Sequence, residues 1–296
     1  MKNTKILIII AVLAIALVGC GNTSENNKSN ITFKIGAIPD QNLTELNKNM
    51  ELMAKYLKEN TGLNVEFVPT SDYAALVTAF HRGDIQLAWV GGLTGVQART
   101  QSIGSTAIAQ RPLDAKFKSV FIYQKDLDIN KLEDLKGKTF TFGSESSTSG
   151  SLMPRYYLAQ AGIDAEKDFN GKPNYAGSHD KTMQLVASGA FQAGVLNILV
   201  WEKTVSENKI DLSKVKVFYT TPEYYDYNWT INGTVDKQFG KGTNNNIIKA
   251  ILKMNGNNSE IEKAILNYYQ TEKFIPTNND NYKNIEEVAK KLGMVN

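Results

Sequence analysis

The chain has 296 residues, of which 42% are hydrophobic and 21% are charged, and its formal net charge is +3. This length allows one large domain or two medium ones, and the composition is that of a globular protein with a sizeable core. No block of lysines or arginines stands out, which argues against nucleic acid as the main partner.

The N-terminus has the pattern of a secretory signal. A short basic segment precedes the apolar stretch Ile6–Val18, which is shorter than the roughly 20 residues needed to cross a membrane. Cys20, the only cysteine, follows Leu17-Val18-Gly19 and resembles a bacterial lipobox cysteine. The alternative is a free cysteine in an uncleaved anchor. We expect a signal peptide over residues 1–19, lipidation at Cys20, and a flexible polar tether over residues 20–30.

From residue 31 onward, strand-like and helix-like segments alternate. The first set is a strand at 31–38, a helix at 44–62, a strand at 64–69, a helix at 71–83 and a strand at 85–92. Thr44 fits the cap that begins the first helix, and Gly62 fits the position just past its end. Asp72 fits the cap of the second helix. This βαβαβ order predicts a mainly parallel sheet covered by helices.

A second alternating set follows and suggests a second lobe. Its strands are expected at 118–124, 138–144, 172–177, 192–197 and 215–221, and helical patterns return after residue 244. We predict an α/β fold of two lobes, formed by 31–116 plus 226–296 and by 117–225. The chain would cross between them near 115–118 and near 222–228. Ligands of such folds bind in the cleft, at the carboxyl ends of the strands.

Hydroxyl groups crowd the start of one predicted helix, in the sequence GSESSTSG. A helix N-terminus presents unpaired N–H groups and partial positive charge, so it can hold an oxyanion without a lysine. Ser147, Thr148 and Ser149 would add hydroxyl donors, and Gly150 allows close approach. The alternative is that Ser147 or Ser149 merely caps the helix. We expect all three hydroxyl residues to bind ligand.

Four further positions are candidates for the same cleft. Tyr73 begins a predicted helix and could offer a phenol donor, and Gly91 ends a strand in a Gly-Gly pair that permits close backbone approach. His179 begins another helix, where it either donates to the anion or is simply solvated. Tyr225 lies in the aromatic run YYDYNW at the second crossing, which either lines the cleft or stacks under the hinge.

The sequence shows no metal-ligand spacing, phosphate-binding lysine loop or acid–base pair, and this pattern favours binding over catalysis. We therefore expect no cofactor and no metal.

Several segments are similar to the phosphonate/phosphite-type solute-binding proteins of ABC importers. They are GAIPDQN, TSDYAALVTAFHRGDIQLAWVGG, LKGKTFTFGSESSTSGSLMPRYYL, GSHDKTMQLVASGAFQAGVLN and VFYTTPEYYDYNW. Within that family the chain resembles most the branch described as selenate-binding. The resemblance implies a type II periplasmic-binding fold with a two-crossing hinge, and a permease and an ATPase as partners.

The resemblance also places the oxyanion donors on Ser147, Thr148, Ser149, Tyr73 and His179. Asn197 stands where family members that bind an amine would carry an acid, which argues against aminoalkylphosphonates. Phosphate, phosphite, methylphosphonate, sulfate and selenate stay open. A carboxylate facing the ligand would favour the protonated phosphorus anions, and an all-donor cleft would favour sulfate and selenate. The acids to consider are Asp40, Asp180 and Asp226.

The predicted function is a monomeric lipoprotein on the extracytoplasmic face of the cell membrane, which delivers a small tetrahedral oxyanion to an ABC permease. One alternative is an exported enzyme that acts on a phosphate ester with His179 as acid or base. Another is a sensor or adhesion lipoprotein that uses the same fold.

Overall fold

The computed structural model describes residues 31–295, and these form one compact unit. The expected signal peptide, Cys20 and tether lie outside the described residues. No helix within 31–295 is both long enough and apolar enough to span a membrane.

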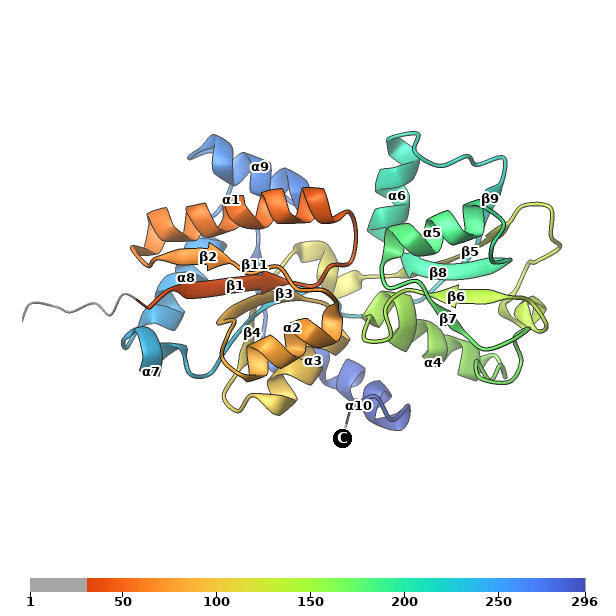
Figure 1. Cartoon of the computed structure of the whole chain (residues 1–296), viewed down its shortest axis with the longest axis horizontal. Coiled ribbons are helices and arrows are strands. Elements are labelled where there is room, and N and C mark those ends of the chain that lie inside the picture. The colour runs from red at the N-terminus through yellow and green to blue at the C-terminus, as the bar shows by residue number, and fades with distance from the viewer. Residues whose placement is uncertain (1–30, 296) are drawn as a thin grey trace, which may run out of the picture. The chain divides into compact units, whose positions relative to one another are not determined.

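Lobe 1 is built on a six-stranded sheet with the strand order β11-β4-β10-β3-β1-β2 (Figure 1). Its strands are β1 (Phe33–Ala37), β2 (Val65–Phe67), β3 (Leu87–Val90), β4 (Thr106–Gln110), β10 (Asn228–Ile231) and β11 (Ile275–Pro276). Its helices are α1 (Leu43–Thr61), α2 (Tyr73–His81), α3 (Gly92–Gln101), α7 (Val235–Phe239), α8 (Thr243–Leu252), α9 (Glu260–Tyr268) and α10 (Lys283–Lys291). Helices α1 and α9 lie on one side of the sheet, and α2 and α3 lie on the other.

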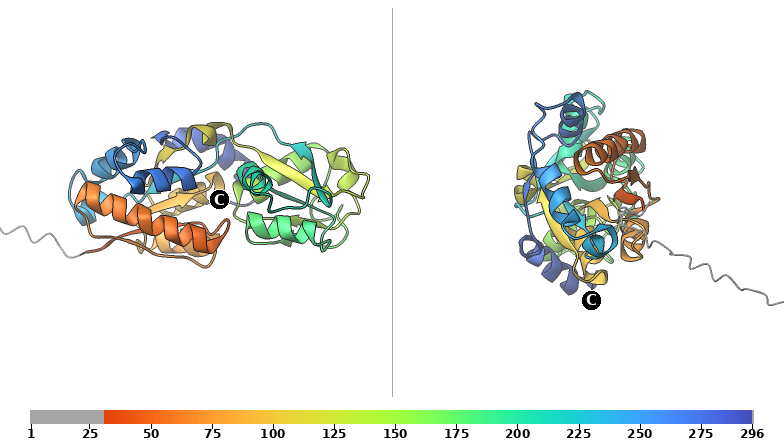
Figure 2. Two further views of the ribbon diagram at one scale, coloured as in Figure 1. Left: turned by 90° about the horizontal axis from the view of Figure 1, so that it is seen from above. Right: turned by 90° about the vertical axis from the view of Figure 1, so that its left-hand side faces the viewer.

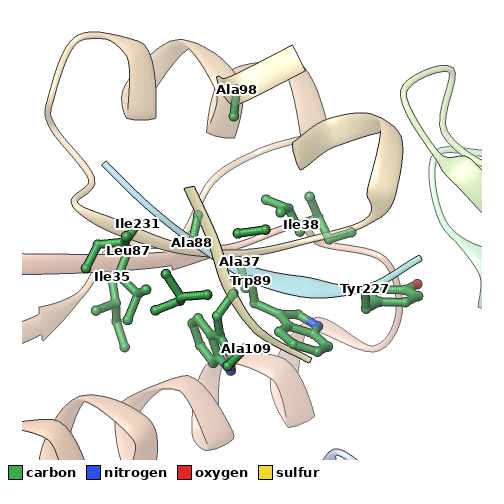
Figure 3. Close-up of a cluster of buried hydrophobic side chains, with 14 of the residues drawn as sticks. Ile35, Ala37, Ile38, Leu87, Ala88, Trp89, Ala98, Ala109, Tyr227 and Ile231 are labelled. Carbon is green, nitrogen blue, oxygen red and sulfur yellow. The ribbon is translucent and has the colours of Figure 1, made fainter. Parts of the chain in front are cut away.

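The core of lobe 1 reaches to the end of the sheet that faces lobe 2. Strands β1, β3 and β10 contribute buried side chains such as Ile35, Leu87 and Ile231 (Figure 3). Trp89 and Tyr227 lie at the end of this cluster, with their rings stacked at 5.6 Å. The hydroxyl of Tyr227 points away from the cluster (Figure 3), so this residue joins the apolar core to the polar groups described below.

Lobe 2 is built on a five-stranded sheet with the order β7-β6-β8-β5-β9. Its strands are β5 (Ser119–Gln124), β6 (Phe140–Phe142), β7 (Asn174–Tyr175), β8 (Ala193–Asn197) and β9 (Val215–Thr220). Helices α4 (Met153–Gln160), α5 (His179–Ala187) and α6 (Ile198–Ser206) cover it, with short 3-10 or π turns at Leu132–Leu135 (η2) and Thr148–Leu152 (η3). Alternate residues of β5 enter different cores, because Phe121 packs on one face of the sheet and Val120 and Ile122 on the other.

The expected parallel order holds for the βαβαβ set, where β1 pairs in parallel with β2 and β3, but neither sheet as a whole is mainly parallel. Of the nine strand pairings, β1–β2, β1–β3, β6–β7 and β6–β8 are parallel and the other five are antiparallel. The difference comes chiefly from the crossings: β5 and β10 each enter their sheet from the other lobe, and each runs against both of its neighbours. Apolar patterning located β5 but missed β10, and it carries no signal for the direction of either strand.

The two crossings lie side by side. Phe117 and Tyr224 form an antiparallel bridge, with backbone N–H···O distances of 2.8 and 3.0 Å. Helix α10 makes a further connection, since it packs beside α3 in lobe 1 and reaches η3 and α4 in lobe 2 (Figure 2). The bridge therefore connects the two crossing segments at the point where the lobes separate.

Local capping explains where the helices near the cleft begin and end. Asn42, not Thr44, caps α1 by accepting from the Glu45 N–H, so the predicted cap was wrong by two residues. Gly62 follows α1 with φ of 72°, which confirms the predicted end. Asp72 caps α2 by accepting from the Ala75 N–H, as predicted, and this places Tyr73 at the first position of that helix.

Candidate functional site

The hydroxyl-rich segment forms the start of a helix in lobe 2. Ser147 is the cap residue: its Oγ accepts from the Gly150 N–H at 3.0 Å, so the capping role that the sequence left open is filled. The first bond of the turn runs from the Leu152 N–H to the Ser147 carbonyl. The N–H groups of Thr148 and Ser149 precede that ladder, and such groups have no partner within a helix. Capping and anion binding are therefore compatible here.

A hydrogen bond to the Ser149 carbonyl fixes the backbone of this turn. The Ser119 hydroxyl donates to the Ser149 carbonyl at 2.7 Å and contacts the Tyr224 hydroxyl at 2.6 Å. Ser119 begins β5, and Tyr224 is in the second crossing, so both crossings support the turn. This arrangement fixes the backbone that carries Thr148 and Ser149.

Lobe 1 meets the turn at the Gly91–Gly92 pair. The Leu93 N–H donates to Thr148 Oγ1 at 2.9 Å, and the Thr94 hydroxyl donates to the Ser146 carbonyl at 2.9 Å. A Cβ on Gly91 would lie 3.0 Å from Thr148 Oγ1 and 3.1 Å from Asp226 Oδ1. Glycine is thus required for the approach of these side chains, and the approach of a ligand to the Gly91 backbone stays a prediction.

Asp226 brings a carboxylate to the same place. Its Oδ1 accepts from the Gly92 N–H at 2.9 Å, and its buried Oδ2 has no hydrogen-bond partner within residues 31–295. Burial raises the pKa of Asp226 to about 7, although the Gly92 N–H and the Thr148 and Ser149 hydroxyls act to lower it. The carboxyl is only 1% exposed. A buried acceptor without a partner suggests a ligand that can donate a proton.

Tyr73 points a second unpartnered group toward this cluster. Its hydroxyl is buried and makes no hydrogen bond within the described residues. Burial raises the pKa of Tyr73, as do the nearby charges of Asp40 and Asp226, while the Ser147 hydroxyl lowers it. The phenol is therefore protonated at neutral pH and available as a donor. Tyr73 comes from lobe 1 and Ser147 from lobe 2, so these donors converge from opposite sides.

His179 belongs to a neighbouring network. Its Nδ1 accepts from the Asn197 N–H at 3.3 Å, and its Nε2 lies 3.4 Å from the Tyr227 hydroxyl. That hydroxyl donates to Asp40 Oδ2 at 2.7 Å and accepts from Asn197 Nδ2 at 3.0 Å. Burial lowers the pKa of His179 to about 3, so the ring is neutral, and its proton resides on Nε2 because Nδ1 accepts. This network joins the two lobes through the second crossing.

Of the two remaining candidates, Asn197 joins the network around His179 and Tyr225 does not. Asn197 caps α6, with its Oδ1 accepting from Leu199 and Val200, and takes part in the network just described. Tyr225 is half-buried and its ring packs edge-on against Tyr282 at 5.9 Å, away from the hydroxyl cluster. Its neighbours Asp226 and Tyr227 approach the cleft instead. The sequence feature that indicates Asp226 and Tyr227 is an acidic residue within an aromatic run at a crossing.

Comparisons with known proteins identify the family. The family model for the phosphonate-type periplasmic substrate-binding protein of ABC transporters matches residues 35–282. The chain belongs to this family. It is 44% identical over 270 residues to the "Probable ABC transporter phosphite binding protein PhnD1" of Prochlorococcus marinus, covering 89% of this chain and 90% of the relative.

A crystal structure of that Prochlorococcus protein in complex with methylphosphonate has a TM-score of 0.86 and 43% identity to this chain, and it covers 90% of this chain and 100% of its own. A phosphate-import protein of Mycolicibacterium smegmatis is 31% identical over 195 residues, covering 62% of this chain and 60% of the relative. The family assignment confirms the type II periplasmic-binding fold and the role of an extracytoplasmic substrate-binding component of an ABC importer.

This role also decides between the alternatives drawn from the sequence. Members of the family are binding proteins whose partners are a permease and an ATPase. The exported phosphate-ester enzyme with a catalytic His179 is therefore set aside.

Proposed function

We propose that this protein captures a singly protonated phosphorus oxyanion, with phosphite and methylphosphonate as the leading ligands. The observation that carries the proposal is the unpartnered Asp226 Oδ2 beside the hydroxyls of Thr148 and Ser149. The similarity to a probable phosphite-binding protein, and to the structure of that protein with methylphosphonate, supports the same choice.

The carboxylate favours phosphorus over sulfur and selenium. Phosphorus oxyanions of this type take up a proton with a pKa of about 6, so at pH 7 about a tenth of them carries an O–H that can donate, and the site would select that form. Sulfate and selenate are dianions whose oxygens only accept, and they would face an ionised Asp226 with like charge and no proton to share. This repulsion grows as pH rises through about 7, because the pKa of Asp226 is about 7 and the carboxyl is half ionised there.

The proposed ligand-binding residues supply donors around that acceptor. The hydroxyls of Tyr73, Ser147, Thr148 and Ser149, with the N–H groups at the start of η3, would bind the anionic oxygens. Gly91 leaves room for them. Both ring nitrogens of His179 have partners, since Nδ1 accepts from the Asn197 N–H and Nε2–H faces the Tyr227 hydroxyl at 3.4 Å, so His179 would donate to the ligand only by giving up its contact with Tyr227. Asn197 and Tyr227 hold that ring in place.

We further propose the processing and placement of the chain. Residues 1–19 would be removed and Cys20 lipidated, with 20–30 as a tether that holds a monomer at the membrane. The two lobes would move as 31–116 plus 226–295 and 117–225, about the bridge between the crossings. A Cys20→Ala variant should leave the membrane fraction and appear in the soluble extracytoplasmic fraction. Unchanged membrane association would contradict the anchor.

The ligand is tested by thermal unfolding and titration calorimetry at pH 8 with phosphite, methylphosphonate, phosphate, sulfate and selenate. A ligand at 100 times its dissociation constant stabilises the protein by about 2.7 kcal/mol. We expect phosphite or methylphosphonate to raise the midpoint while sulfate and selenate leave it unchanged. Stabilisation by sulfate or selenate alone would contradict the assignment of Asp226.

A further inference from the structure

One ion pair joins the two lobes at the open side of the cleft. Lys203 Nζ on α6 of lobe 2 lies 2.7 Å from Glu45 Oε2 on α1 of lobe 1. The other ion pairs within residues 31–295 connect groups of the same lobe or of the paired crossings. The Lys203 side chain is 25% exposed and that of Glu45 is 43% exposed, so the pair is partly shielded from solvent.

A second contact between the lobes lies close by in the sequence. The His179 N–H, at the start of α5, donates to the Asp40 carbonyl at 2.9 Å, just past the end of β1. Both contacts join the segment that leads into α1 to helices of lobe 2. Neither contact involves the hydroxyls or the carboxylate assigned to the ligand.

The pair spans a groove of about 260 Å³ that both lobes line. Gln41, Asn42 and Glu45 come from lobe 1, and Asp180, Met183 and Lys203 are among those from lobe 2. The groove therefore exists in this form only while the lobes are closed. Its carboxylates outnumber its two lysines, so Lys203 is held among acids, and its removal leaves a net repulsion across the groove.

We propose that Glu45 and Lys203 form a closure latch, which sets ligand affinity by stabilising the closed conformation without touching the ligand. The inference rests on the proposed function, since it concerns capture at that site. Apparent affinity depends on the fraction of protein in the binding-competent state, so a contact made only on closure strengthens binding. Because the pair must break before the lobes separate, it slows release of the ligand.

The test is a double-mutant cycle with Glu45→Gln, Lys203→Met and the double variant, and phosphite is the probe. Each single variant should bind phosphite about two- to fivefold more weakly, through faster dissociation in stopped-flow displacement. The double variant should match a single variant, because the pair is broken once. Asp164→Asn and Lys167→Met are the matched control, since that pair has the same 2.7 Å separation within lobe 2; they should not change affinity.

The outcomes separate the latch from the ligand assignment. Equal phosphite affinity in all variants, or additive losses in the double variant, would overturn the latch and leave the proposed function intact. If the wild-type protein binds neither phosphite nor methylphosphonate, the proposed function is overturned. The latch is then decided by small-angle scattering of the ligand-free protein. A larger radius of gyration in the double variant than in wild type supports it, and equal radii overturn it.

Discussion

Asp226 and Asp40 are two carboxylates buried in the same cleft, and they differ in how their oxygens are used. Burial raises the pKa of both, to about 7 for Asp226 and about 6 for Asp40. The Tyr227 hydroxyl occupies Asp40 Oδ2 at 2.7 Å, whereas Asp226 Oδ2 has no partner within residues 31–295. A perturbed pKa thus does not by itself mark a ligand group. The unfilled acceptor is the better indication of one, and from this contrast we propose Asp226 as the specificity residue and Asp40 as a structural one.

The largest expected effect comes from Asp226→Asn. The amide removes the negative charge and can present an N–H donor to an oxygen that only accepts. Sites built to pair with a ligand proton reject analogues without one by large factors, so the ratio of phosphite to sulfate affinity at pH 8 should fall about a hundredfold or more. Calorimetry with both anions measures this ratio. An unchanged ratio would show that Asp226 does not face the ligand.

Thr148→Val should have a somewhat smaller effect, which is a loss of phosphite affinity. The variant removes a hydroxyl that accepts from the Leu93 N–H and is available to donate to the ligand or to Asp226. A hydrogen bond to a charged group contributes roughly 1.5–3 kcal/mol, which predicts about ten- to hundredfold weaker phosphite binding. Ser213→Ala, at an exposed turn in lobe 2, serves as the control and should bind as wild type. Wild-type affinity in Thr148→Val would contradict its assignment.

The stability of the ligand-free protein should depend on pH through the same two carboxylates. Each has a folded-state pKa raised from 3.8, so folding favours the protonated form. Stability is then fully present below about pH 4 and is lost as pH rises toward 6 for Asp40 and 7 for Asp226. At about 1.4 kcal/mol per unit of pKa, the loss from Asp226 is at most about 4 kcal/mol. Opening of the lobes in the free protein would expose Asp226 to water and so reduce this loss of stability.

Urea unfolding between pH 4 and 8 measures this slope. Asp226→Asn should flatten the curve between pH 6 and 7 and lower its slope by about half between pH 4 and 6, where the contribution of Asp40 persists. Parallel curves for the variant and wild type would mean that Asp226 is not buried in the free protein.

Local patterns in the sequence were enough to locate the hydroxyl and glycine groups of the candidate site. The hydroxyl cluster at Ser147–Ser149, the Gly91 approach and the Asp72 cap depend on residues close together in the chain. The acceptor half was harder, because the Phe117–Tyr224 bridge decides which side chains of the second crossing face the cleft. Without that long-range pairing, alternation alone could not separate Tyr225 from Asp226. The direction of β5 and β10 escaped prediction for the same reason.

Asp40→Asn provides the smallest effect and the sharpest contrast with Asp226→Asn. An asparagine keeps an oxygen that can accept from the Tyr227 hydroxyl, and the His179 N–H bonds the Asp40 backbone carbonyl, which the substitution leaves in place. The network that joins the lobes should therefore survive, with phosphite affinity within about threefold of wild type and the phosphite-to-sulfate ratio unchanged. Calorimetry beside Asp226→Asn makes the comparison direct. If Asp40→Asn lowered the ratio as far as Asp226→Asn does, the ligand proton would be shared with Asp40 as well, and an occupied acceptor could no longer be taken as a sign of a structural role.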